Sequence, residues 1–352
     1  RVLRERPCVL PFLYVVEPVG DVVCQMPFLL IVIIDIALIF DFLNGFHDSR
    51  NIVATMISTR AMSPRKAILI AATAGLVGPF LFGVAVATTI GSEVVDPDAI
   101  TSAVIISALA SAILWTLFTW YFGWPSSTSH ALIGGLIGAV VIAAGFQTIN
   151  LEGLRKVLIA LLISPILGLV IGYLVLKVIY FLARGASPGI NSVFKRSQLG
   201  TSLALALSHG TNDAQKTMGI IAMAMVTTGF VTDFQVPWWV IALSACAIAL
   251  GTALGGWRLI ETLGGKFFKI RPVHAFGSQL TSAGIILGAA LMGGPVSTTQ
   301  VVSSSIMGAG SADRVSKVRW TGARDIAAAW LFTIPVTALL AAGLYLVIDL
   351  FL

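Results

Sequence analysis

Residues 123–130 read Gly-Trp-Pro-Ser-Ser-Thr-Ser-His, and residues 293–300 read Gly-Gly-Pro-Val-Ser-Thr-Thr-Gln. In both segments a proline and a run of hydroxyl side chains stand at the head of an apolar stretch that predicts a helix. Pro125 and Pro295 suit the first helical position, where no N–H is needed, and Ser or Thr side chains cap free amides. Because a helix start carries partial positive charge, each segment predicts half of an oxyanion site. The alternative is that the hydroxyls only bond one helix to another.

The rest of the chain has the composition of a protein embedded in a lipid bilayer. Of its 352 residues, 57% are hydrophobic and 11% are charged, whereas a soluble domain has about 25% charged residues. The mean hydropathy is +0.95, and the apolar runs reach about 20 residues, enough to cross a hydrocarbon core. The net charge of +6 does not indicate a nucleic-acid partner, because the basic residues lie in short loops, where orientation signals occur. We therefore expect an all-α, multi-pass protein of the cytoplasmic membrane.

Three landmarks occur twice and in the same order, which predicts an internal repeat. The first landmark is a polar break around an aspartate, at residues 44–48 and again at 209–213. A Thr-aliphatic-Gly triplet follows at 89–91 and 262–264, and the hydroxyl segment comes last. The spacing from Asp48 to the first hydroxyl segment is close to the spacing from Asp213 to the second. The chance recurrence of small polar residues is the alternative explanation.

The charges of the loops predict that the two copies are inverted. The loop at 60–66 is basic, whereas its counterpart at 230–236 holds only an aspartate; the loop at 91–98 is acidic, whereas its counterpart at 257–273 is basic. Since Lys and Arg mark cytoplasmic loops, equivalent loops face opposite sides of the membrane. Five crossings in each half would produce this inversion. Inverted repeats with broken or re-entrant helices are typical of secondary transporters, whose binding site lies between the repeats.

The repeat predicts four parts of the chain. They are an N-terminal extension of unassigned role at residues 1–25, a first transmembrane repeat at 26–183, a cytoplasmic connection at 184–198 and a second, inverted repeat at 199–352. The extension is basic and would face outward, which fits the charge rule poorly.

Each polar break holds a carboxylate, Asp48 or Asp213, at membrane depth, where such a group is costly and by default functional. Carboxylate and amide oxygens suit a hard cation. The predicted ligands of a coupling cation are Asn44, Asp48, Asn51, Asn212 and Asp213, with Asp48 and Asp213 as metal ligands if the ion is Na⁺. A cation there would offset the charge of the anion. The alternative is that Asp48 and Asp213 form buried ion pairs with Arg50 and Lys216.

Five further polar residues adjoin these motifs and are candidate accessory residues: His47, His130, His209, Lys216 and Gln300. His47 and His209 flank the aspartates and would be able to relay protons, since histidine titrates near neutral pH; a packing role is the alternative. His130 and Gln300 occupy equivalent positions and would shape the anion site. Asp35 and Asp41 lie in the first apolar run and receive no assigned role.

At these motifs, over essentially residues 26–352, the chain resembles the inorganic phosphate transporter (PiT) family. The matching motifs are residues 44–48 with Asn51, residues 125–130, residues 209–216 and residues 295–299. The resemblance implies import of inorganic phosphate, in some members as a metal–phosphate complex, by symport with Na⁺ or H⁺ and alternating access, with no cofactor besides the coupling ion. It also implies that phosphate is bound by the hydroxyl residues Ser126, Ser127, Thr128, Ser129, Ser297, Thr298 and Thr299. Arg50 departs from the pattern, because a small residue is expected there, and residues 1–25 have no counterpart.

Other functions compete with this interpretation. A symporter of another tetrahedral oxyanion, such as sulfate, has the same requirements. A membrane-embedded metal hydrolase would use the histidines and aspartates of the polar breaks, but the chain has no His-Glu-x-x-His run and no recognisable serine–base pair. A structural or receptor role leaves the duplicated motifs unexplained. We therefore expect a transporter and not an enzyme; the sequence leaves open the driving ion and whether the carrier is a homodimer.

Overall fold

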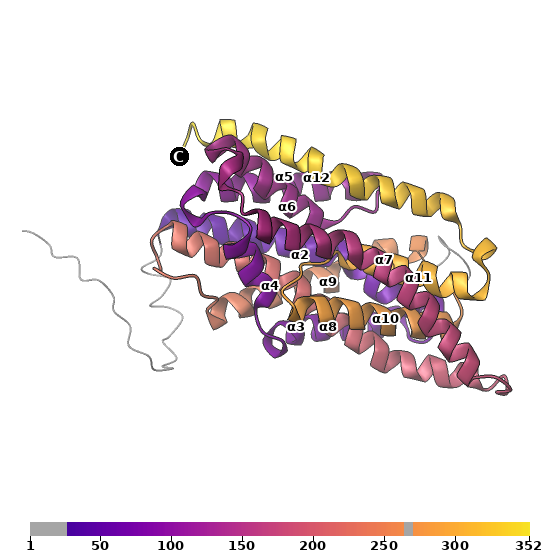
Figure 1. The fold of residues 1–352 in the computed structure, drawn as a ribbon. Coiled ribbons are helices and arrows are strands. Elements are labelled where there is room, and N and C mark those ends of the chain that lie inside the picture. The colour runs from indigo at the N-terminus through magenta and orange to yellow at the C-terminus, as the bar shows by residue number, and fades with distance from the viewer. Residues whose placement is uncertain (1–26, 264–269) are drawn as a thin grey trace, which may run out of the picture.

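The computed structural model describes residues 27–263 and 270–352, in which all regular elements are helices and the extended chain forms one isolated bridge, Val95 to Ile149 (Figure 1). The first half contains α2 (Phe28–Ser58), α3 (Pro64–Leu81), α4 (Ala85–Thr88), η1 (Thr89–Glu93), η2 (Pro97–Ala99), α5 (Ser102–Phe122), α6 (Thr128–Ala144), η3 (Phe146–Thr148) and α7 (Leu151–Leu182). The second half contains α8 (Ile190–Thr227), α9 (Trp238–Leu263), α10 (Pro272–Leu291), α11 (Thr298–Asp313), η4 (Val315–Lys317) and α12 (Trp320–Ile348). The predicted extension at 1–25 lies outside the described residues.

The long helices of the two halves follow one another in the same order, as an internal repeat predicts. In that order α2, α3, α5, α6 and α7 correspond to α8, α9, α10, α11 and α12. The packing is exchanged between the halves: α2 lies against α9 while α8 lies against α3, and α7 lies against α11 while α12 lies against α6. Figure 1 shows α12 running along α5 and α6 at one edge of the bundle. The two halves are therefore interlocked; the inversion of one relative to the other stays a prediction.

Two glycines at equivalent positions let the aspartate helices approach the opposite half closely. Gly45 of α2 faces the backbone carbonyl of Ile248 in α9, and Gly210 of α8 faces the backbone of Gly75 in α3. A Cβ atom at either glycine would collide with main-chain atoms, which cannot move aside as a flexible side chain does. Each glycine lies three residues before an aspartate, so these contacts fix the positions of both carboxylates in the bundle.

The prediction that the aspartate segments interrupt their helices is wrong. Both α2 and α8 run without a break through Asp48 and Asp213. The glycines of these segments serve close packing, and the polar side chains point into the protein, so the helical hydrogen bonds of the backbone are kept. Helix α7 ends at Leu182 and α8 begins at Ile190, so α8 starts within the predicted connection at residues 184–198.

Interrupted helices do occur elsewhere in the described part of the chain. The pair formed by α3 and the α4–η1 stretch is bent by 72° at a short break. The helices α6 and α11 have 17 and 16 residues, fewer than the roughly 20 that cross a bilayer. Five described helices are long and apolar enough to span a membrane, or six if the bent pair counts as one span, so this criterion does not confirm five crossings in each half.

Candidate functional site

The hydroxyl segments form the first turns of α6 and α11. The side chains of Ser127 and Ser297 are the N-caps, and they accept hydrogen bonds from the amides of His130 (3.3 Å) and Gln300 (3.4 Å). The prediction that the prolines occupy the first helical position is wrong, because the helices begin only after the capping serines. The prolines lie two residues before the caps, in the extended chain that leads into each helix.

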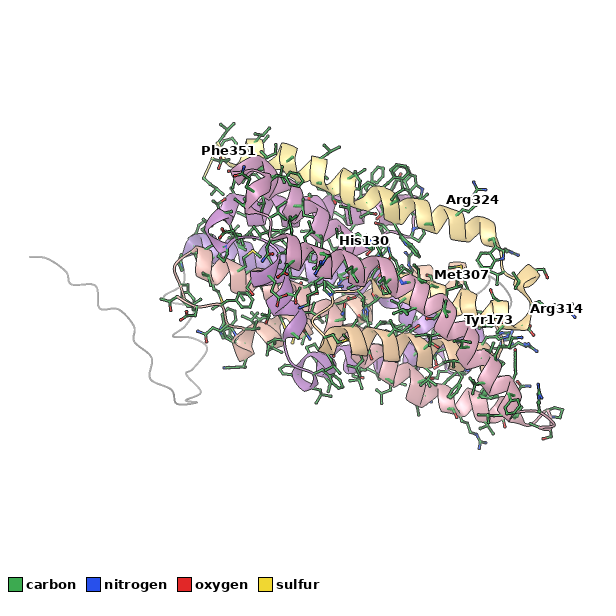
Figure 2. All side chains as sticks on the ribbon, viewed as in Figure 1. His130, Tyr173, Met307, Arg314, Arg324 and Phe351 are labelled. Carbon is green, nitrogen blue, oxygen red and sulfur yellow. The ribbon has the colours of Figure 1, made fainter. Side chains whose placement is uncertain are left out.

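The two helix starts touch each other, although they come from different halves. The Ser129 hydroxyl donates to the carbonyl of Val296 (3.0 Å), and the Gln300 amide nitrogen lies 3.4 Å from both ring nitrogens of His130. The side chains of both segments are at most 5% exposed from Ser126 to His130 and from Ser297 to Gln300, and Figure 2 shows His130 inside the bundle. The first two amides of each helix have no acceptor within the helix, so the junction offers N–H groups from two sides.

Asp48 of α2 is bound by a hydroxyl of the opposite half. Its Oδ1 atom accepts hydrogen bonds from Thr299 Oγ1 (2.7 Å) and Asn51 Nδ2 (3.1 Å), and Asn51 also donates to Thr299 Oγ1 (2.9 Å). The Nδ1 atom of His47 lies 3.0 Å from the same carboxylate oxygen. Asp48 is 2% exposed, so this carboxylate has neutral donors and a histidine around it in a region without bulk water.

Asp213 of α8 has a different set of partners. The ammonium group of Lys216 donates to Asp213, to the Ser129 hydroxyl (2.6 Å) and to the carbonyl of Val296 (3.3 Å). The Nδ1 atom of His209 lies 3.0 Å from the other carboxylate oxygen of Asp213. Lys216 therefore forms a buried ion pair, as the alternative interpretation of the aspartates predicted for this half.

One hydroxyl lies between the two carboxylates. Thr298 Oγ1 is 3.1 Å from an oxygen of Asp48 and 3.1 Å from an oxygen of Asp213. Since a hydroxyl has a single proton to donate, it can satisfy only one carboxylate at a time. The two predicted cation sites thus meet at the start of α11.

The other predicted residues divide into those at the site and those outside it. The Thr128 hydroxyl donates to Asn44 Oδ1 (2.7 Å), and Asn212 donates to the carbonyl of Gly294 (3.3 Å), so both asparagines touch the hydroxyl segments. Arg50 forms no ion pair with Asp48; its Nη2 atom lies 3.3 Å from His47. The hydroxyl of Ser126 instead accepts from Trp115 Nε1 (2.8 Å) and lies 3.2 Å from Thr333, on α5 and α12.

Several polar atoms around the junction have no hydrogen-bond partner among the described residues. They are Asn44 Nδ2, Asn212 Oδ1 and Gln300 Oε1. All three side chains are at most 1% exposed. Because a buried polar atom without a partner costs about 1–3 kcal/mol, such atoms mark a place where a ligand would complete the bonding.

Asp41 is one of the two aspartates of the first apolar run to which the sequence assigns no role. It is completely buried, and neither carboxylate oxygen has a hydrogen-bond partner among the described residues. The charged groups that interact with it electrostatically are Asp213 and Lys216. The signal in the sequence was its spacing, because Asp41 precedes Asp48 by two helical turns and so lies on the same face of α2.

Comparison with known proteins agrees with this geometry. The profile of the phosphate transporter family matches residues 44–341. The probable low-affinity inorganic phosphate transporter of Bacillus subtilis (strain 168) is 44% identical over 326 residues, which cover 92% of this chain and 98% of the relative. The protein of the same description from Rhizobium meliloti (strain 1021) is 43% identical over 324 residues, 92% of this chain and 97% of the relative.

A solved structure has the same fold. It is described as the sodium-dependent phosphate transporter, and it superimposes with a TM-score of 0.83 at 25% identity over 92% of this chain and 100% of its own. These matches confirm the resemblance expected from the motifs, the all-helical membrane fold and the expectation of a transporter and not an enzyme. Because the family profile covers most of the chain and both bacterial relatives match over nearly their whole length, the chain belongs to the phosphate transporter family.

Proposed function

We propose that this chain imports inorganic phosphate across the cytoplasmic membrane by symport with Na⁺ or H⁺, through alternating access. The observation that carries the proposal is the junction of two hydroxyl-lined helix starts, one from each half, beside Asp48 and Asp213. Phosphate would take the amides and hydroxyls, and the coupling cation would take the carboxylates. The names of the relatives and of the structural neighbour support phosphate as the anion and an ion as its partner.

Neutral donors suit a transported anion better than arginine would. Amide and hydroxyl donors at a helix start bind an oxyanion through partial charges and hydrogen bonds. An anion held by such groups leaves more easily than one held in a bidentate pair with a guanidinium group. Ser127 and Ser297 hold the helix starts in place as caps, and Thr128, Ser129, Thr298 and Thr299 supply the hydroxyls that line the junction.

The hydrogen bonds at the junction suggest how the two ions are coupled. In this structure Thr298 and Thr299 give their hydroxyl protons to the carboxylates. A cation bound to Asp48 would neutralise that carboxylate and release the Thr299 proton for phosphate. Without the cation, the charge of the nearby carboxylate would repel phosphate. The hydroxyl protons would also be engaged by the carboxylates and would not be available to phosphate. Each ion thus raises the affinity for the other, as symport requires.

Phosphate uptake by the purified full chain in liposomes tests this proposal. We expect uptake of radioactive phosphate to rise when an inward gradient of Na⁺ or of H⁺ is imposed separately, and excess sulfate to leave it unchanged. In Asp48→Asn, which keeps the size of the side chain and removes its charge, the dependence on the gradient should disappear. Uptake at equal rates with and without either gradient would refute symport, and inhibition by sulfate would favour a broader oxyanion carrier.

A further inference from the structure

The two cation sites are symmetry mates with one chemical difference. Asp48 and Asp213 occupy equivalent positions, and the residue three positions later is Asn51 in α2 but Lys216 in α8. In the hydroxyl segments Thr299 is equivalent to Ser129. Two contacts correspond: Asn51 bonds its own aspartate and Thr299, and Lys216 bonds its own aspartate and Ser129. The second half therefore has an ammonium group where the first half has a neutral amide.

The surroundings of the ammonium group are those of a bound metal cation. Lys216 is 1% exposed, and its nitrogen contacts a carboxylate, a hydroxyl at 2.6 Å and a carbonyl at 3.3 Å. These oxygen types are the ones that suit a hard cation such as Na⁺. The ammonium group is a compact charge of the same sign, and its flexible stem carries it into position. The ammonium group thus already supplies a positive charge in direct contact with Asp213.

In the described part of the first half no lysine or arginine side chain forms an ion pair with Asp48, although the buried guanidinium group of Arg50 interacts with it electrostatically through space. Asn51 is neutral, and Arg50 contacts His47 and not the carboxylate of Asp48. Asp48 has neutral hydrogen-bond donors and an adjacent histidine, while a carboxylate at membrane depth requires a compensating charge. Asp48 is thus the aspartate whose carboxylate is open to direct contact with a cation from solution.

We infer that the ammonium group of Lys216 permanently occupies the cation site of the second half, so that only the site at Asp48 exchanges its cation during transport. The inference rests on the proposed cation role of Asp48. It predicts that this carrier moves one cation fewer, and one positive charge fewer, per phosphate than a carrier with an asparagine in both halves would move.

Two separate substitutions, Lys216→Asn and Asn51→Lys, test the inference in both directions. In Lys216→Asn the second half acquires the side chain of the first, and we expect one additional Na⁺ per chain in equilibrium binding of radioactive Na⁺ to the purified protein at saturating phosphate. The matched control is Lys216→Asn combined with Asp213→Asn, which lacks the carboxylate and should bind no additional Na⁺. In Asn51→Lys the first half acquires an ammonium group, and cation-dependent phosphate uptake should become independent of the cation gradient.

The outcomes separate this inference from the proposed function. The number of bound Na⁺ ions is measured without transport. A wild-type protein that fails to take up phosphate would therefore overturn the proposed function, while the Na⁺ count would still test the inference about Lys216. If uptake by the wild type follows the Na⁺ gradient, an unchanged Na⁺ count in Lys216→Asn would overturn the inference, as would an equal gain in the double variant. If uptake follows the H⁺ gradient, retained gradient dependence in Asn51→Lys would overturn it. If Lys216→Asn does not fold, the variant Asn51→Lys decides: phosphate uptake that still depends on the cation gradient in this variant would overturn the inference.

Discussion

Replacing Thr298 with alanine removes the one hydroxyl that touches both carboxylates. In the loaded carrier we assign this hydroxyl to phosphate, and a hydrogen bond to a charged group contributes about 1.5–3 kcal/mol. Its loss should raise the KM for phosphate about 10- to 150-fold, since each 1.4 kcal/mol changes an affinity by a factor of about ten. In the wild-type protein the Thr298 hydroxyl competes with the cation for Asp48 and Asp213. Its removal should therefore lower the half-saturating cation concentration or leave it unchanged.

The assay is uptake of radioactive phosphate into proteoliposomes, with phosphate and the driving cation varied independently. Thr298→Ser is the matched control, because it keeps the hydroxyl and loses only a methyl group; its KM should stay close to that of the wild type. Incorporation of each variant into the liposomes is quantified to exclude a folding defect. A raised half-saturating cation concentration with an unchanged KM for phosphate would refute the reasoning and would make Thr298 a cation ligand.

Three further predictions follow from the packing. Gly45→Ala should lower stability by about 1–3 kcal/mol, since the new Cβ meets the carbonyl of Ile248, whereas Gly284→Ala, where a Cβ has open space, should not; equal melting temperatures would contradict this. Ser126→Ala should leave the KM for phosphate unchanged while lowering the melting temperature, because its hydroxyl bonds Trp115 away from the junction; a raised KM would return Ser126 to the site. Asp41→Leu should raise stability by about 1–3 kcal/mol, because it removes a completely buried carboxylate; a lowered melting temperature would show that the interactions of Asp41 with Thr217 and Lys216 outweigh the cost of its burial.

The sequence predicts the hydroxyl helix starts and the aspartates, because both depend on local chemistry. A run of Ser and Thr before an apolar stretch is capping chemistry wherever it occurs. The details that failed depend on tertiary contacts. Gly45 was interpreted as part of a break, but its lack of a side chain serves the contact with α9. Ser126 has the same residue type as Ser127, and the sequence does not predict that its hydroxyl bonds Trp115 of α5; its role in phosphate binding stays a prediction.

The most specific property of the site was also the least predictable. The pairing of Asn51 with Thr299, and of Lys216 with Ser129, joins residues that are distant in the sequence and lie in different halves. The repeat predicts that the two halves meet, but not which hydroxyl meets which aspartate. Local periodicity contains no information on such contacts, because they are set by the exchanged packing of α6 and α11 on the helices of the opposite half.

The crosswise pairing has a consequence for the history of the chain. Neither half contains a complete site, because Asp48 bonds Thr299 of the second half and Lys216 bonds Ser129 of the first half. An ancestor with one half per polypeptide would have needed two copies to bind anything, and identical copies would have built two identical sites. Because Lys216 and Asn51 differ, the two halves of this chain are not interchangeable, and a single polypeptide ensures that every molecule contains one of each.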